Sequence, residues 1–197
     1  SPSARERRST LGPLDARSAL SPALEQRQGG QRGLVGHAEL GHDRGEPGHR
    51  MYYPFYAKCA ELGIPLQIQI GHSAQHFLPT VANPMTLDRV AIDFPELTIV
   101  GIHIGYPWVE EMISVTWKHP NVYVGCDAHS PKYWDPSFIR FINSRRGQDK
   151  VLFGTDWPVI DFERTVNEIG ELGLKEEVLK KLFWDNAVRG YGLEDWV

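Results

Sequence analysis

Three side chains that could bind a metal ion stand near the ends of strand-like segments. His72 follows the segment PLQIQIG, His103 lies within LTIVGIHIG, and Asp156 ends VLFGTD. Two imidazoles and a carboxylate form a ligand set that suits Zn²⁺, Mn²⁺ or a similar divalent ion. The chemistry predicted from these residues is metal-assisted activation of water or of a substrate oxygen.

In three segments a glycine stands two positions before the polar residue. Gly101 precedes His103, Gly125 precedes Asp127, and Gly154 precedes Asp156. Because side chains alternate along a strand, each pair is predicted to share one face, where the glycine leaves room among crowded inward-facing side chains. The first segment departs from this pattern, since Gln69 and Gly71 share a face and His72 comes directly after them. A local bulge would be needed to turn His72 inward.

Structural roles stay open for the same residues. Asp156 could cap the turn that follows its strand, and His72 and His103 could each satisfy backbone groups at a strand end. We interpret three further polar or small residues as packing or loop residues, namely Cys126, Asp127 and His129. The convergence of three ligand types at successive strand ends favours the metal interpretation.

Strands that alternate with helices must position these residues. Candidate strands cover residues 65–71, 97–105, 121–127 and 151–156, and candidate helices cover residues 51–63, 84–94, 107–119, 136–146, 161–173 and 175–191. This alternation predicts βαβ units and a parallel sheet. In folds of this class the functional site lies at the carboxyl ends of the strands.

Composition divides the chain at Met51. Residues 1–50 contain no aromatic residue, no Ile and no Lys, but eight Arg and eight Gly. Such a segment can bury little surface, so we expect residues 1–50 to be disordered or weakly ordered and residues 51–197 to form the fold. The same bias resembles a GC-rich gene read out of frame, or a mispredicted exon. His37, His42 and His49 in this segment are expected to be solvated and not to bind a metal.

Composition and charge also narrow the class of protein. The 197 residues are 41% hydrophobic and 23% charged, which is typical of a soluble globular protein. The net charge of −4 gives no electrostatic reason to bind nucleic acid or an anionic membrane. With only Cys59 and Cys126, neither a disulfide scaffold nor a thiolate metal site is expected. We therefore expect a cytoplasmic protein whose partner is a small molecule.

Five segments of the chain resemble, in order, the amidohydrolase-related family. They are GIPLQIQIGHS, FPELTIVGIHIGYPWVEEM, HPNVYVGCDAHSP, KVLFGTDWP and LFWDNAVRGYGL. This family is the branch of metal-dependent TIM-barrel enzymes that includes aminocarboxymuconate-semialdehyde decarboxylase and the resorcylate-type decarboxylases. The resemblance covers about residues 51–197 and implies an α/β fold, a partial (β/α)₈ barrel whose four strands are barrel strands five to eight.

The resemblance also implies roles for individual residues. Asp156 matches the strand-eight Asp that binds the metal and takes a proton from its water, and His103 matches the strand-six His, a metal ligand or an acid/base residue. The family usually has a His where Gln69 stands, and His72 is the implied replacement. The H-x-H or E-x-H pair of the family's first strand does not occur in this sequence. Strands one to four are therefore expected to be absent.

Two functions follow from this pattern. The first is a metal-dependent hydrolase or non-oxidative decarboxylase, with Zn²⁺ expected ahead of Mn²⁺. A predicted aromatic rim of Tyr106, Trp108 and Trp157 favours an aromatic or unsaturated carboxylic acid as substrate, although packing is the commoner use of such residues. The second is a catalytically inactive half-barrel that acts as a binding or assembly module. A half-barrel exposes two strand edges and an apolar face, so we expect it to associate into a homo-oligomer through these edges, to aggregate or to be marginally stable.

Overall fold

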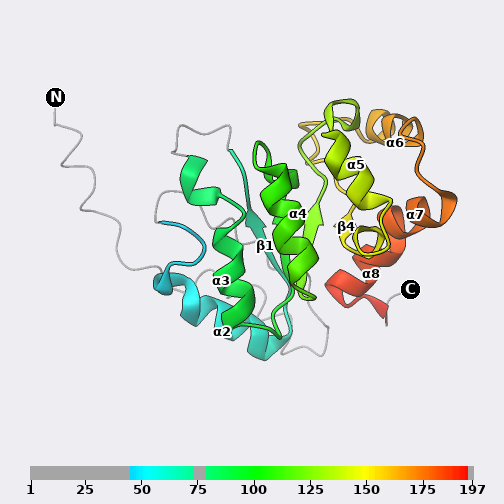
Figure 1. Ribbon diagram of the computed structural model, residues 1–197. Helices are drawn as coiled ribbons and strands as arrows, with labels where there is room; N and C mark the ends of the chain where they lie inside the picture. Colours follow the sequence, from blue (N-terminus) through cyan, green and yellow to red (C-terminus); the bar gives the residue numbers. More distant parts are fainter. Residues whose placement is uncertain (1–44, 73–78, 195–197) are drawn as a thin grey trace, which may run out of the picture. The chain divides into compact units, whose positions relative to one another are not determined.

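The chain folds around a parallel sheet of four strands. The computed structural model describes residues 45–72 and 79–194. The strands are β1 (Leu66–Gln69), β2 (Ile99–Ile102), β3 (Val122–Gly125) and β4 (Val151–Leu152). Each strand pairs in parallel with the next one in sequence, which gives the order β1-β2-β3-β4 (Figure 1). The predicted α/β fold of successive strand–helix–strand units is confirmed.

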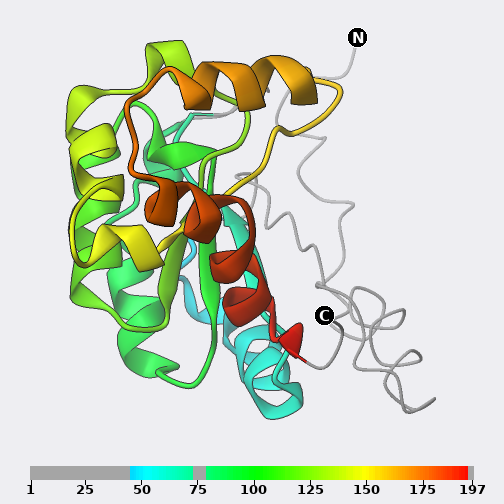
Figure 2. The same cartoon turned by 90° about the vertical axis from the view of Figure 1, so that its right-hand side faces the viewer.

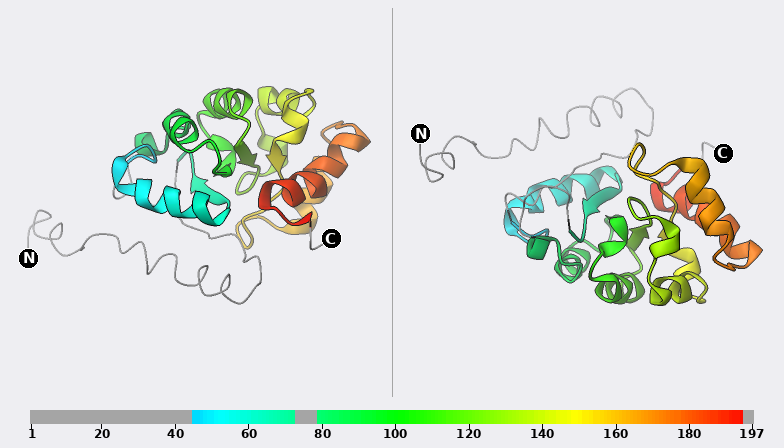
Figure 3. Two further views of the ribbon diagram at one scale, coloured as in Figure 1. Left: turned by 90° about the horizontal axis from the view of Figure 1, so that it is seen from below. Right: turned by 90° about the horizontal axis from the view of Figure 1, so that it is seen from above.

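Helices connect and flank the strands. Those between successive strands are α3 (Thr86–Asp93), α4 (Val109–Lys118) and α5 (Pro136–Ile142), and they lie in a row over one face of the sheet (Figure 3). Helix α2 (Tyr53–Leu62) precedes β1. Helices α6 (Phe162–Gly170), α7 (Glu176–Lys180) and α8 (Asn186–Tyr191) follow β4, with a π-helical turn, η7 (Lys181–Asp185), between the last two. None of the helices in the described ranges is long and apolar enough to cross a membrane.

Capping residues in the sequence fix several helix ends. Helix α2 ends at Gly63, whose φ of 60° is the left-handed conformation that glycine adopts without strain. The side chain of Asn83 accepts a hydrogen bond from the backbone N–H of Met85 at 2.9 Å, just before α3. Asp135 and Asp161 cap α5 and α6 in the same manner. The strand–helix alternation is thus supported by local signals as well as by packing.

The two faces of the sheet have different neighbours. A Cβ added at Gly101 in β2 would meet the side chains of Met112 in α4 and Leu87 in α3, so Gly101 faces the connecting helices. Val100 and Ile102 therefore point to the opposite, inner face. Because β2 pairs in register with β1 and β3, the same alternation assigns Gln67 and Tyr123 to the inner face.

Helix α8 covers part of this inner face (Figure 2). Four inner-face side chains form a buried cluster against Ala187 and Tyr191 of α8, namely Val100, Ile102, Tyr123 and Leu152. The side-chain amide of Gln67 also donates a hydrogen bond of 2.6 Å to the hydroxyl of Tyr191. The expectation that a half-barrel leaves its inner apolar face exposed is wrong for these four residues, because the last helix returns across the strands and covers them.

The described structure begins within the segment that was expected to be weakly ordered. Residues 1–44 of that segment, with His37 and His42, lie outside the described residues. The hydroxyl of Tyr56 in α2 donates a hydrogen bond of 2.9 Å to the carbonyl of Pro47. His49 accepts a hydrogen bond from the backbone N–H of Met51 and so caps the short helix η2 (Arg50–Tyr52). His49 thus has a local structural role.

Candidate active site

Side chains from the ends of three neighbouring strands meet at the carboxyl edge of the sheet. His103 follows β2, Asp127 follows β3 and Asp156 follows β4. The Nε2 atom of His103 lies 3.5 Å from Oδ2 of Asp127 and 3.8 Å from Oδ2 of Asp156. His103 and Asp156, which the sequence placed in one site, are therefore neighbours. Asp127, which was interpreted as a packing or loop residue, lies beside His103 as well.

A left-handed turn brings His103 into this position. Strand β2 ends at Ile102, and the next two residues, His103 and Ile104, have φ angles of 68° and 49°. Left-handed backbone is unfavourable for residues with a Cβ, and it persists only where neighbouring groups hold it. The carboxylate of Asp127 provides one such restraint, because its Oδ1 atom accepts a hydrogen bond of 2.9 Å from the backbone N–H of His103. Asp127 thus contacts both the backbone and the ring of His103.

Two glycines make room for Asp127. A Cβ added at Gly125 would lie 2.9 Å from Oδ1 of Asp127, and one added at Gly154 would lie 3.0 Å from its Cβ. These two glycines line the inner face as predicted, whereas Gly101 faces the helices. The prediction that Gly101 and His103 share a strand face is wrong because the chain leaves the strand at Ile102. Period-two alternation does not extend through the left-handed turn.

Asp156 also adopts a left-handed conformation, with a φ of 56°. Its carbonyl accepts a hydrogen bond of 2.7 Å from the N–H of Val159, so a turn begins at this residue. The side chain of Asp156 is 44% exposed, whereas those of His103 and Asp127 are 14% and 15% exposed. The Asp156 carboxylate is therefore the member of the site that solvent or a ligand reaches most easily.

His72 lies in an aromatic group beside the carboxylates. Its ring centroid is 5.2 Å from that of Tyr106 and 6.0 Å from that of His129. The backbone places it there: Gly71 has a φ of 95°, and the N–H of His72 donates a hydrogen bond of 2.8 Å to the carbonyl of Tyr106. An added Cβ at Gly71 would overlap that same carbonyl, so only glycine permits this approach.

His129 and Cys126 were interpreted as packing or loop residues, and their environments differ. Burial lowers the pKa of His129, and the nearby His103 and His72 act in the same direction. The Nδ1 atom of His129 is buried and has no hydrogen-bond partner among the described residues. Burial raises the pKa of the Cys126 thiol to about 12, which makes a reactive thiolate negligible at neutral pH.

The three aromatic residues of the predicted rim have different surroundings. Tyr106 is 47% exposed and contacts the rings of His72 and His129. Trp157 directly follows Asp156 and is 74% exposed. Trp108 is half-buried just before α4. The ring contacts thus connect Tyr106 with the site, while contact of the two tryptophans with a substrate stays a prediction.

The donor atoms at this edge partly fit a divalent metal ion. One imidazole nitrogen and two carboxylates within 4 Å are the ligand types that Zn²⁺ and Mn²⁺ accept. Within residues 45–72 and 79–194, however, no group of three or more His, Cys, Asp or Glu side chains has the arrangement of a metal site. His103 and Asp156 therefore fit as two ligands, whereas the ring of His72 contacts Tyr106 and His129.

Sequence comparison places the whole described fold within one family. The amidohydrolase family matches residues 9–193 of the chain. The match includes the two segments with His103 and Asp156, and it extends through most of residues 1–50. The predicted resemblance is confirmed at the level of the family. A comparison with proteins of curated function finds no significant match.

Solved structures show the same fold. An uncharacterized TIM-barrel protein from Bordetella bronchiseptica is 28% identical to the chain, with a TM-score of 0.69. The alignment covers 90% of this chain and 63% of that protein, so the chain spans less than two thirds of its length. Together with the four parallel strands, this confirms the prediction of a partial (β/α)₈ barrel.

Two decarboxylases share this fold at lower identity. The 5-carboxyvanillate decarboxylase of Novosphingobium aromaticivorans, solved with manganese and 4-hydroxy-3-methoxy-5-nitrobenzoic acid, is 18% identical, with a TM-score of 0.64 and coverage of 93% of this chain and 63% of its own. The 2,6-dihydroxybenzoate decarboxylase of Rhizobium is 17% identical, with a TM-score of 0.59 and coverage of 91% and 68%. At these identities the likeness concerns the fold.

Proposed function

We propose that this chain, which belongs to the amidohydrolase family, acts as a metal-dependent decarboxylase or hydrolase of a small aromatic or unsaturated carboxylic acid. The observation that carries the proposal is the meeting of His103, Asp127 and Asp156 within 4 Å at the carboxyl edge of the sheet. The two decarboxylases that share the fold are named for aromatic acids, which supports this class of substrate.

In this proposal Asp156 and His103 bind a divalent ion, with His72 as the third ligand. Zn²⁺ is our first choice, and Mn²⁺ is the alternative supported by the manganese found in structures of the decarboxylase relatives. When bound, the ion would supply Lewis-acid polarisation of a substrate oxygen or a more acidic water. Tyr106, Trp108 and Trp157 would surround the apolar part of the substrate, and Tyr106 already lies beside His72.

The side chains of the site could move the protons that either reaction requires. Decarboxylation breaks a carbon–carbon bond and leaves an electron pair on the carbon that loses CO₂, so this carbon needs a proton. Where His103 does not bind the ion, its Nε2 atom would carry that proton, while Asp127 contacts the ring and accepts a hydrogen bond from the backbone N–H of His103. In hydrolysis, the exposed carboxylate of Asp156 would accept a proton from the attacking water.

A second function has its own support. Within the described residues, no group of three or more His, Cys, Asp or Glu side chains has the arrangement of a metal site. This observation supports the alternative proposal, a catalytically inactive half-barrel that acts as a binding or assembly module. In that case the carboxylates at the edge of the sheet would have no reaction to perform, and strand edges would provide contacts between copies.

Metal analysis of the purified chain distinguishes the two functions. About one ion per chain that survives dialysis supports the enzyme, whereas loss of all metal under mild dialysis supports the inactive module. The loaded protein is then incubated with 2,6-dihydroxybenzoate and related aromatic acids. Release of CO₂ identifies a decarboxylase, and release of an alcohol or amine from ester or amide analogues identifies a hydrolase. A metal-loaded chain without either activity on a broad panel of substrates would contradict the proposal.

A further inference from the structure

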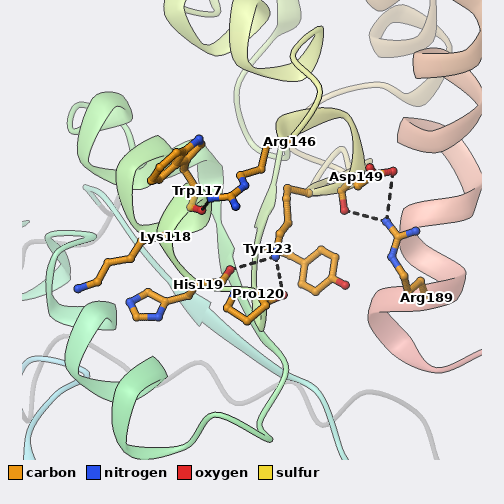
Figure 4. Close-up of a pocket in the computed structure, with 9 residues that line it drawn as sticks. Trp117, Lys118, His119, Pro120, Tyr123, Arg146, Asp149 and Arg189 are labelled. Carbon is orange, nitrogen blue, oxygen red and sulfur yellow. Dashed lines mark hydrogen bonds and ion pairs between the residues drawn. The ribbon is translucent and has the colours of Figure 1, made fainter.

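A second group of charged and aromatic residues lies at the amino edge of the sheet, opposite the candidate active site. It surrounds a hollow of about 460 Å³ (Figure 4). Lys150 directly precedes β4, and Pro120 lies just before β3, whereas His103, Asp127 and Asp156 follow their strands. The lining residues are Trp117, Lys118, His119, Pro120, Tyr123, Arg146, Asp149, Lys150 and Arg189.

Positive charge in this hollow exceeds negative charge. The guanidinium of Arg146 turns towards Trp117 and donates a hydrogen bond of 2.8 Å to its carbonyl (Figure 4). Arg189 lies on the other side of the hollow and donates to the carbonyl of Asp149 and to Oδ1 of Asn186, each at 2.8 Å. Asp149 is the only carboxylate in the lining, and its Oδ1 atom lies 2.9 Å from Nζ of Lys181 but 3.8 Å from Arg189. Within the described ranges, Arg146 forms no ion pair. At least one guanidinium group therefore lacks a carboxylate partner.

Lys150 adds a third positive charge, and its ammonium group is already hydrogen-bonded within the fold. Its ammonium group donates to the carbonyls of His119 and Val122, each at 3.0 Å, and to that of Pro120. Burial lowers the pKa of Lys150 to about 8, and the charges of Arg189 and Arg146 act in the same direction. Three cations thus lie close enough to repel one another, and a bound anion would relieve that repulsion.

The remaining walls are flat and apolar. The guanidinium of Arg146 lies 4.4 Å from the ring centre of Trp117, and the ammonium of Lys150 lies 4.7 Å from that of Tyr123. Trp117 is 57% exposed, so part of its indole is accessible to a ligand, whereas Tyr123 is 9% exposed. A volume of this size matches pockets that hold small organic molecules, and an inorganic anion alone would leave most of it unfilled.

We propose that this hollow binds a small aromatic carboxylate, whose carboxylate interacts with Arg146 and Arg189 and whose ring lies against the exposed part of Trp117. Guanidinium groups bind carboxylates through paired hydrogen bonds, and aromatic walls accept a flat ring. The site is separate from the candidate active site, because the two lie at opposite ends of the strands. It does not depend on the proposed catalytic function.

Calorimetric titration of the full chain with benzoate, benzamide and inorganic phosphate tests the proposal. Benzoate is expected to bind about 10-fold more tightly than benzamide, which has the same ring but no charge, and more tightly than phosphate, which has no ring. Benzoate binding should weaken as salt is raised, because partly exposed charges are screened. Equal binding of benzoate and benzamide, or no binding of benzoate, would overturn the proposal.

Variants of Arg146 and of its neighbour Arg145 test whether benzoate binds in this hollow. Arg146→Gln is expected to weaken benzoate binding by about 10-fold, and Arg146→Lys by less, since it keeps the charge but loses the paired geometry. Arg145→Gln is the matched control, because Arg145 is an exposed neighbour that does not line the hollow. Thermal unfolding of each variant verifies that it is folded. Benzoate binding that survives Arg146→Gln but is lost in Asp156→Asn would place the ligand at the carboxyl edge and refute the assignment.

Discussion

The two ends of the sheet hold their charged groups in different ways. At the amino edge, Lys150 donates to three backbone carbonyls and has no hydrogen left for another acceptor. At the carboxyl edge, Asp156 lies in a left-handed turn with 44% of its side chain exposed. The first arrangement satisfies a charge within the fold, while the second leaves a carboxylate free to bind something else. We therefore expect Lys150 to contribute mainly to stability and Asp156 mainly to chemistry.

Replacing the exposed carboxylate of Asp156 should have the largest effect, and it tests the proposed role of the carboxyl end of the sheet. We expect Asp156→Asn to lower turnover by about 1,000-fold or more, because the amide neither binds a metal ion well nor accepts a proton. The melting temperature should change by less than about 2 °C, since the side chain is exposed. Steady-state kinetics and thermal unfolding are the measurements, with the exposed capping residue Asp161→Asn as control. Retained turnover in Asp156→Asn would remove this residue from the mechanism.

At the amino end, the expected effect is on stability. Lys150→Met removes three hydrogen bonds worth about 1 kcal/mol each, partly offset by the relief of burying a charge. We expect a loss of about 1–3 kcal/mol in the free energy of unfolding, measured by urea denaturation, with unchanged metal content. Lys175→Met is the control, because Lys175 is exposed and precedes α7. A Lys150→Met protein as stable as the parent would mean that the carbonyl contacts contribute little.

Asp127→Asn tests whether Asp127 acts at the carboxyl edge by restraining its neighbour His103. The amide oxygen can still accept the hydrogen bond from the backbone N–H of His103, but the negative charge beside the ring is lost. We expect turnover to fall by about 10–100-fold with little change in KM, since His103 would be held less firmly for proton transfer. Asp127→Ala should lose more, because the backbone restraint disappears as well. Equal effects of the two variants would contradict the role of the N–H hydrogen bond.

The smallest expected effect is a pH dependence near the carboxyl edge. Burial acts to raise the pKa of Glu168, but hydrogen bonds from Ser130, Arg164 and the N–H of Lys132 outweigh it and lower the pKa from 4.5 to about 2. A carboxyl whose pKa is lower in the folded state stabilises the fold above pH 4.5, and this contribution is lost as the pH falls towards 2.

Urea denaturation between pH 3 and pH 6 measures this contribution. We expect Glu168→Gln to reduce the slope of stability against pH by about 1 kcal/mol or less over that range, since solvent screens the pairs. Glu163→Gln, an exposed residue of the same helix, is the control. An unchanged slope in Glu168→Gln would show that other carboxyl groups govern the acid sensitivity.

Local sequence patterns predicted the elements better than the site. Apolar runs and caps such as Asn83 and Asp135 located the strands and helices, because these signals act within a few residues. The pairing of His103 with Asp156 was also predicted, since parallel strands bring their carboxyl ends together. Asp127 carried the same glycine signal as its neighbours, but we interpreted it as a packing or loop residue, so the sequence analysis left it out of the site.

Other features depend on backbone angles or on distant parts of the chain. The left-handed turn at His103 and Ile104 ends the alternation of side chains along the strand early, and nothing in the sequence HIG requires that turn. The cover that Tyr191 provides for the inner face depends on where α8 returns, which no local pattern encodes. The metal roles of His72, His103 and Asp156 and the nature of residues 1–50 stay predictions.

The hydrogen bond between Gln67 and Tyr191 joins the first strand to the last helix, 124 residues apart. The inner side of the sheet is shielded from water only once α8 has been synthesised and has packed against Val100, Tyr123 and their neighbours. Folding of the sheet therefore depends on contacts between residues that are far apart in the sequence, and removal of α8 would leave these side chains exposed.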